Sequence, residues 1–170
     1  ITDADPDAVE GIAVIAADST HGSWQFTTDD GGNWLDMGSP SSAAARLLAA
    51  DASTRVRYVP SADFSGTIGN GLTLVAWDRT SGSSGSTADA STRGGATAFS
   101  EGVKTASIVV NAVNDAPVLD SSGDTSLATI NEDDTSNAGT LISAMIASAG
   151  GDRITDADTG AVEGVAITGA

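Results

Sequence analysis

Residues 22–37 read GSWQFTTDDGGNWLDM, and this stretch decides the fold class. Trp24 and Phe26 are two residues apart, so in a strand their side chains share one face. Asp30-Gly31 supplies the positive φ angles that a tight hairpin turn requires. The pattern predicts an antiparallel hairpin with one apolar face, a building unit of β-sandwiches.

Similar short runs of alternating or β-branched apolar residues occur on both sides of this hairpin, separated by Gly, Asp, Asn and Ser. They predict an all-β sandwich. The expected strands are 9–16, 22–28, 33–37, 54–59, 71–78, 104–112, 126–131, 140–146 and 162–168. Residues 41–50 favour a short helical turn that leads into a strand. Residues 79–102 are rich in Gly, Ser and Thr and favour a long loop or loose hairpin, more simply a mobile surface segment than a binding loop.

The first 17 residues recur near the other end of the chain. ITDADPDAVEGIAVIAA at 1–17 and ITDADTGAVEGVAITGA at 154–170 are identical at 11 of 17 positions, at an offset of 153 residues. Solenoid repeats are roughly 20–50 residues long, so each repeat of this period is expected to be a domain. The chain is therefore interpreted as a fragment that spans one full period of a tandem array. Residues 1–112 are the C-terminal two thirds of one repeat, 113–117 a linker, and 118–170 the N-terminal third of the next.

The composition is strongly acidic. The 170 residues include 23 acidic and 7 basic side chains, a net charge of −16, and no cysteine. Such a surface repels phosphate backbones and anionic lipids, so neither a nucleic-acid partner nor membrane insertion is expected, and cations are the natural partners. Without cysteine there are no disulfides, and calcium is the usual substitute in a secreted chain. The same acidity also suits a protein adapted to high salt, whose carboxylates only hydrate its surface.

No catalytic constellation is present in the sequence, so we do not expect an enzyme. His21 is the only histidine and is most simply a surface residue. The chain has no Gly-x-Ser-x-Gly elbow, no phosphate-binding loop and no zinc-binding helix.

Two pairs of aspartates have the spacing of calcium ligands. Asp3-Ala4-Asp5 recurs as Asp156-Ala157-Asp158, and alternate side chains of an extended segment point the same way. Each pair can therefore present two carboxylates to one Ca²⁺, which prefers oxygen ligands. Asn114 and Asp115 add oxygen donors beside the linker, whereas Asp29-Asp30 is better interpreted as a turn. Acidic turns without a metal remain the alternative for all of these residues.

The order of the motifs resembles the cadherin-like repeats found in tandem in very large bacterial surface proteins, including adhesins of the repeats-in-toxin type. The motifs are INEDD at 130–134, GTLI at 139–142, ITDAD at 154–158, GSWQF at 22–26, RYVPSADFSG at 57–66, LTLVAWD at 72–78 and VNDAP at 113–117. The resemblance implies a Greek-key β-sandwich of the cadherin and immunoglobulin kind, with calcium at the joints between domains. It also implies an extracellular protein, either secreted or on the cell surface.

The resemblance further implies which residues bind calcium. Asp156 and Asp158 match the Asp-x-Asp ligands after a joint, with Asn114 and Asp115 as the linker ligands. The equivalent cluster of the first repeat comprises Asp3, Asp5 and Asp78, while Glu132 matches an acidic ligand near the first strand and Asp63 a mid-domain acidic position.

We therefore expect a structural extender repeat of a large adhesin, stiffened by calcium. Its expected partners are adjacent copies of the same repeat, within one chain or head to tail between chains. The reason is that residues 118–170 are opening strands without the body of a repeat, and residues 1–112 are a body without its opening strands. The alternative is a carbohydrate-binding β-sandwich that contacts a glycan through Trp24, Trp34 or Trp77 and the 79–102 loop.

Overall fold

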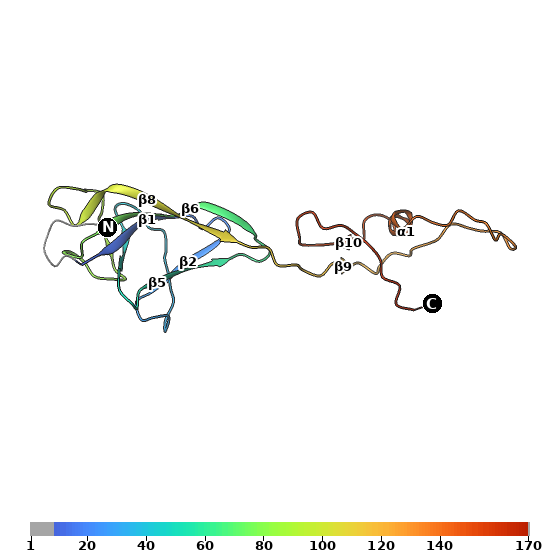
Figure 1. Cartoon of the computed structure of the whole chain (residues 1–170), viewed down its shortest axis with the longest axis horizontal. Helices are drawn as coiled ribbons and strands as arrows, with labels where there is room; N and C mark the ends of the chain where they lie inside the picture. Colours follow the sequence, from blue (N-terminus) through green and yellow to red (C-terminus); the bar gives the residue numbers. More distant parts are fainter. Residues whose placement is uncertain (1–8, 170) are drawn as a thin grey trace. The chain divides into compact units, whose positions relative to one another are not determined.

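The computed structural model describes residues 9–169 of the chain. The chain divides into two compact units, Ile1–Asn111 and Ala112–Ala170 (Figure 1). The described part of the first unit is an antiparallel β-sandwich, which confirms the all-β fold class. That the units are parts of two successive repeats stays a prediction.

Five strands form the larger sheet of the sandwich, in the spatial order β7-β4-β1-β6-β8. Their bounds are β1 Gly11–Ala17, β4 Ala45–Ala49, β6 Gly66–Trp77, β7 Thr87–Ala88 and β8 Phe99–Val110. The central strand β1 pairs with β4 and β6, neither of which is its neighbour along the chain. Such non-consecutive pairing is typical of Greek-key sandwiches.

Three strands form the smaller sheet, in the order β3-β2-β5. They are β2 Gly22–Thr27, β3 Leu35–Asp36 and β5 Arg55–Pro60. Trp24 and Phe26 point from β2 into a core shared with Val14, Leu48 and Leu72 of the larger sheet. The apolar face that the hairpin sequence predicted is therefore buried between the two sheets.

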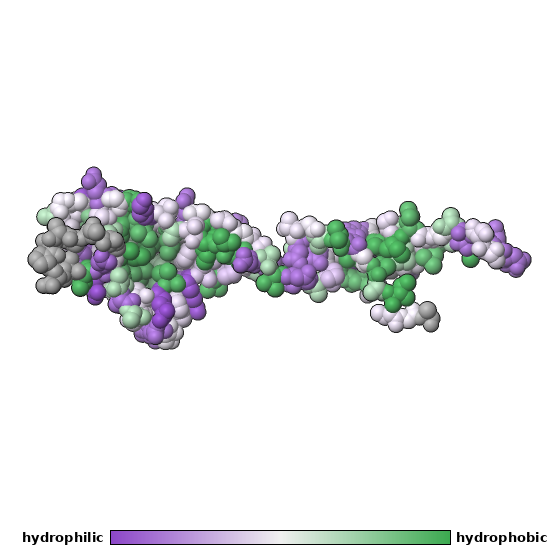
Figure 2. Space-filling model, in the orientation of Figure 1, coloured by the Kyte–Doolittle hydropathy of each residue, from purple (hydrophilic) through white to green (hydrophobic). Residues whose placement is uncertain are grey.

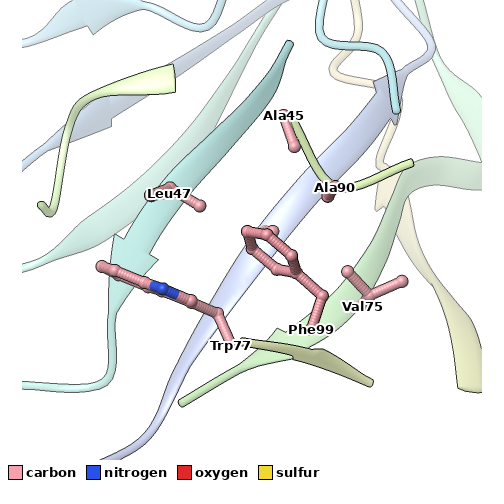
Figure 3. Packing of buried hydrophobic residues seen from close by; sticks show 7 residues of the cluster. Ala45, Leu47, Val75, Trp77, Ala90 and Phe99 are labelled. Atoms are coloured by element: carbon pink, nitrogen blue, oxygen red, sulfur yellow. The ribbon is translucent and has the colours of Figure 1, made fainter. Parts of the chain in front are cut away.

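The larger sheet is covered on its other face as well. Ala13 and Val14 are neighbours in β1 and point to opposite faces, yet both are 0% exposed. A second hydrophobic cluster contains Leu47, Trp77 and Phe99, with the Phe99 ring at its centre (Figure 3). Two separate cores therefore lie on the two faces of one sheet.

The segment between β6 and β8 covers this second core. Leu47 donates a backbone hydrogen bond to Ser86 O at 3.0 Å, Ala90 donates one to Ser42 O at 2.7 Å, and Ala90 is 0% exposed. The short strand β7 within the segment pairs with β4. Residues 79–98 are mostly loop, as expected, but the segment is more than a surface excursion, because Ala90 completes the packing of Trp77 and Phe99.

The segment 41–50 also differs from its prediction. A tight turn closed by mutual backbone hydrogen bonds between Ser41 and Ala44 stands where a helical turn was expected, and β4 follows it. Alanine favours helices in isolation, but pairing with β1 on one side and β7 on the other overrides that local preference.

The hairpin and the positive φ angles after β2 are as predicted, but residues 28–34 connect β2 to β3, so the turn is longer than the tight one expected. Asp30 and Gly31 have φ angles of 61° and 96°, in the left-handed region. The Asp29 carboxylate accepts hydrogen bonds from Thr27 Oγ1 at 2.5 Å, Asn33 N at 2.9 Å and Asn33 Nδ2 at 2.7 Å. These bonds, with Thr27 first, lower the pKa of Asp29 from 3.8 to about 2.

Asp29 is expected to make the first unit acid-sensitive. Because its pKa is lower in the folded state, its contribution to stability is complete above about pH 4 and is lost as the pH falls through about 2. In Asp29→Asn, the free energy of unfolding in urea should therefore change less between pH 5 and pH 2. Asp63→Asn, at an exposed turn, is the control. Equal acid dependence in wild type and Asp29→Asn would contradict the prediction.

The second unit contains little regular structure within its described residues. Strands β9 (Val118–Leu119) and β10 (Ile154–Thr155) form one short antiparallel pair, and α1 (Ile142–Ser148) is a helix of 7 residues. The expected strands at 126–131 and 162–168 are not formed, and 140–146 overlaps the helix. These three predictions are wrong for the structure of this chain.

The reason is that the expected strands have no described sheet to join. Strands need hydrogen-bonded partners, and isolated ones are not stable in water. Leu127, Val162 and Ile167 are 68%, 95% and 82% exposed. Hydrophobic side chains accordingly appear on the surface of this unit (Figure 2).

Candidate cation site

An acidic hollow lies within the second unit, with a volume of about 630 Å³. The side chains with oxygen atoms that line it are Asn114, Asp115, Asp152, Thr155, Asp156, Asp158 and Glu163. Among the described residues that line it there is no Lys or Arg. Five carboxyl groups without a basic neighbour in the lining favour a cation.

The pairing of β9 with β10 explains why these residues meet. The strands are antiparallel, with Thr155 opposite Val118. The start of β9 therefore lies beside the end of β10. Asn114 and Asp115 precede β9 and Asp156 follows β10, so both groups reach the same edge of the pair.

Backbone hydrogen bonds fix the carboxylates in this hollow. Asp115 N donates to Asp158 Oδ2 at 2.9 Å, and Asp158 N donates to Asp156 Oδ1 at 2.8 Å. Asn114 Nδ2 donates to Asp115 O at 2.7 Å. The linker residues and the Asp-x-Asp pair thus form one connected group, and each of the two bonded carboxylates keeps a second oxygen available to a ligand.

Two acidic residues of the hollow, Asp152 and Glu163, were not predicted as ligands from the sequence. Partial desolvation first, and then the charge of Asp152 and a hydrogen bond with it, raise the pKa of Glu163. Desolvation is the larger cause, and the charge of Asp152 adds to it. The repeat contained the signal, because Glu163 corresponds to Glu10 at the offset of 153 residues.

The donor set fits calcium, which takes six to eight oxygen ligands from carboxylates, amides and backbone carbonyls. Among residues 9–169, however, no three His, Cys, Asp or Glu side chains lie close enough together to hold a metal ion. A cation at the hollow would have to draw Asp156, Asp158 and their neighbours together. The repulsion between like charges that now opposes this approach would be offset by the ion.

Asp78 lies at a smaller hollow in the first unit, with a volume of about 180 Å³. It follows β6, and its carboxylate accepts hydrogen bonds from Thr80 N at 2.8 Å and Thr80 Oγ1 at 2.7 Å. Glu10 lines the same hollow. Asp3 and Asp5, the other predicted members of this cluster, lie outside the described residues.

The last two predicted ligands lie elsewhere. Glu132 is exposed in a turn that the Asp134 N to Asn131 O hydrogen bond closes. Asp63 is exposed in the turn between β5 and β6, with φ 60°. Neither residue is part of the described lining of the two hollows.

Comparison with known proteins identifies no relative: no protein family, curated protein or solved structure matches the chain. Of the helices in residues 9–169, none has the length and apolar character needed to cross a membrane.

Proposed function

We propose that the chain is a structural extender repeat of a large extracellular or cell-surface adhesin, with calcium stiffening its joints. The observation that carries this proposal is the hydrogen-bonded group of Asn114, Asp115, Asp156 and Asp158 at the acidic hollow. A cation held there would bind the linker residues and the body of the second unit at once. Metal binding would then be coupled to the direction in which the linker leaves that unit.

Adjacent copies of the same repeat are the proposed partners. The internal repeat supports this, since 11 of 17 residues recur at an offset of 153. The exposed apolar side chains of the second unit support it as well, because surfaces of this kind mark sites of protein association.

The carbohydrate-binding alternative has less support. Trp24 and Trp77 are 5% and 1% exposed and belong to the two cores. The Arg57 guanidinium lies 4.1 Å from the centre of the Trp34 ring and covers one of its faces. The stacking platform that a sugar ring needs is thus limited to the other face of one half-buried side chain.

Calcium binding should depend on the Asp-x-Asp pair. In Asp156→Asn/Asp158→Asn, we expect the affinity for Ca²⁺ measured by titration calorimetry to fall at least about tenfold, since calcium affinity follows ligand charge. Asp124→Asn/Asp133→Asn removes the same charge from the second unit outside the hollow, and it should bind like wild type. If both variants lose affinity equally, the carboxylates act only as a diffuse charge, as in a salt-adapted surface.

Removal of calcium should make the full chain more flexible. Small-angle X-ray scattering with excess chelator is expected to give a broader distribution of intramolecular distances than scattering with Ca²⁺. The same distribution with and without calcium would remove stiffening from the proposal, even if the ion binds.

A further inference from the structure

The segment 164–169 lies at the end of the second unit and corresponds to residues 11–16, which form most of β1, with Gly164 and Ala166 identical and Val165 and Ile167 conservative replacements. In the sandwich, β1 is the central strand between β4 and β6. In the second unit, the similar sequence forms no strand over residues 164–169, and Val165 and Ile167 are 41% and 82% exposed. Two similar segments therefore lie in two different environments in one chain.

The glycine that opens both segments is explained by only one of these environments. A Cβ atom on Gly11 would lie 2.7 Å from Trp77 Cε3 and 2.8 Å from Leu48 O, closer than real Cβ atoms approach. At Gly164, no heavy atom of the described residues beyond its chain neighbours would lie within 4 Å of an added Cβ. The second unit does not require a glycine there, whereas the place between β4 and β6 does.

The other buried positions of β1 are also compatible with the residues found at 164–169. Ala13 and Val14 are 0% exposed, and their counterparts Ala166 and Ile167 are identical or larger by one methylene group. Thr168 replaces Ile15, which is partly buried against the second core, and Gly169 replaces Ala16, which is exposed in β1. The three fully buried positions, Gly11, Ala13 and Val14, are thus identical or changed by one methylene group, and the larger changes fall at partly buried or exposed positions.

We propose that residues 164–169 are a β1 strand for a second copy of the sandwich, and that they bind between its β4 and β6. The occupant is a second copy of residues 18–111, because the first copy already holds its own β1. In the register of the first sandwich, Gly164 would lie opposite Ala49 and Trp77 of the second copy. This inference rests on the proposed tandem array and names the surface through which one repeat unit completes the next.

The test uses an extended protein in which a second copy of residues 18–111 follows Ala170 of the full chain. The protein has no cysteine, so a single Ala90→Cys in the second copy reports burial of its core through the rate of thiol labelling. We expect labelling at least about 100-fold slower than in urea, as for a site that opens only by unfolding. The same substitution in the first copy calibrates a folded sandwich.

Two variants decide the matter. Gly164→Val in the extended chain should return labelling of the second copy to the rate in urea, while Gly169→Val should leave it slow. Rapid labelling without further substitution, or slow labelling in Gly164→Val, would overturn the proposal. Tryptophan emission gives a second measurement, because the blue-shifted signal of buried Trp24 and Trp77 should double only when the second copy folds. All of these measurements are made in chelator, so they are independent of whether calcium binds.

Discussion

Trp77→Ala is expected to destabilise the first unit by about 3–5 kcal/mol, the range measured when large aromatic side chains are removed from protein cores. Trp77 is 1% exposed and packs against Leu47 and Phe99 in the core that the β6–β8 segment covers. Its indole N–H donates to Ser81 O at 2.8 Å. The substitution would leave a cavity and would also free the segment from one of its attachments.

The measurement is urea unfolding followed by far-ultraviolet circular dichroism, which does not depend on the tryptophan removed. Trp34→Ala is the matched control, because Trp34 is half-buried and its contact with Arg57 is a surface cation–π interaction. Such a contact contributes about 0.5–1 kcal/mol. If Trp77→Ala lost no more than the roughly 1 kcal/mol expected for Trp34→Ala, the second core would contribute little to stability.

Local chemistry made the hairpin and its turn predictable from sequence. Trp24 and Phe26 had to share a face, and Asp30-Gly31 had to adopt positive φ angles; the structure confirms both. The covered outer face of the larger sheet was not predictable in this way. The sequence of residues 79–102 is polar and glycine-rich, and only a few apolar side chains pack it into the second core, namely Ala88, Ala90, Ala98 and Phe99.

Tertiary context also explains the failures in the second unit. Residues 164–169 have a pattern similar to that of β1, yet they form no strand because the described part of that unit provides neither a β4 nor a β6 beside them. A sequence pattern predicts what a segment can pair with, and the pairing itself depends on partners elsewhere in the chain or beyond it.

Only part of the candidate site was predictable from the sequence. The Asp-x-Asp spacing indicated Asp156 and Asp158, and the structure places both in one hollow with Asn114 and Asp115. Glu163 reaches the same hollow from a position with no recognisable ligand spacing. Its recurrence as Glu10 in the repeat was a signal, but only the folded chain shows that it lines the hollow.

Gly11→Val is expected to destabilise the first unit by about 3 kcal/mol or more, at the upper end of the cost of overpacking. Two neighbours would meet the new Cβ, Trp77 Cε3 at 2.7 Å and Leu48 O at 2.8 Å. Neither can move easily, because the Trp77 indole is held by Ser81 and Leu48 O belongs to the backbone of β4, opposite Ile12 of β1. The strain would therefore separate β1 from β4 at the centre of the sheet.

The matched control is the same substitution at the repeated position. Gly164→Val in the unextended chain should leave the urea midpoint of the first unit unchanged, because no described heavy atom beyond its chain neighbours lies within 4 Å of the added Cβ. Urea unfolding followed by Trp24 and Trp77 emission reports on the first unit alone, since all three tryptophans belong to it. If Gly11→Val unfolds at the wild-type midpoint, the close approach of β1 to Trp77 is not a constraint on this fold. The presence of glycine at both Gly11 and Gly164 would then no longer support a second β1 strand.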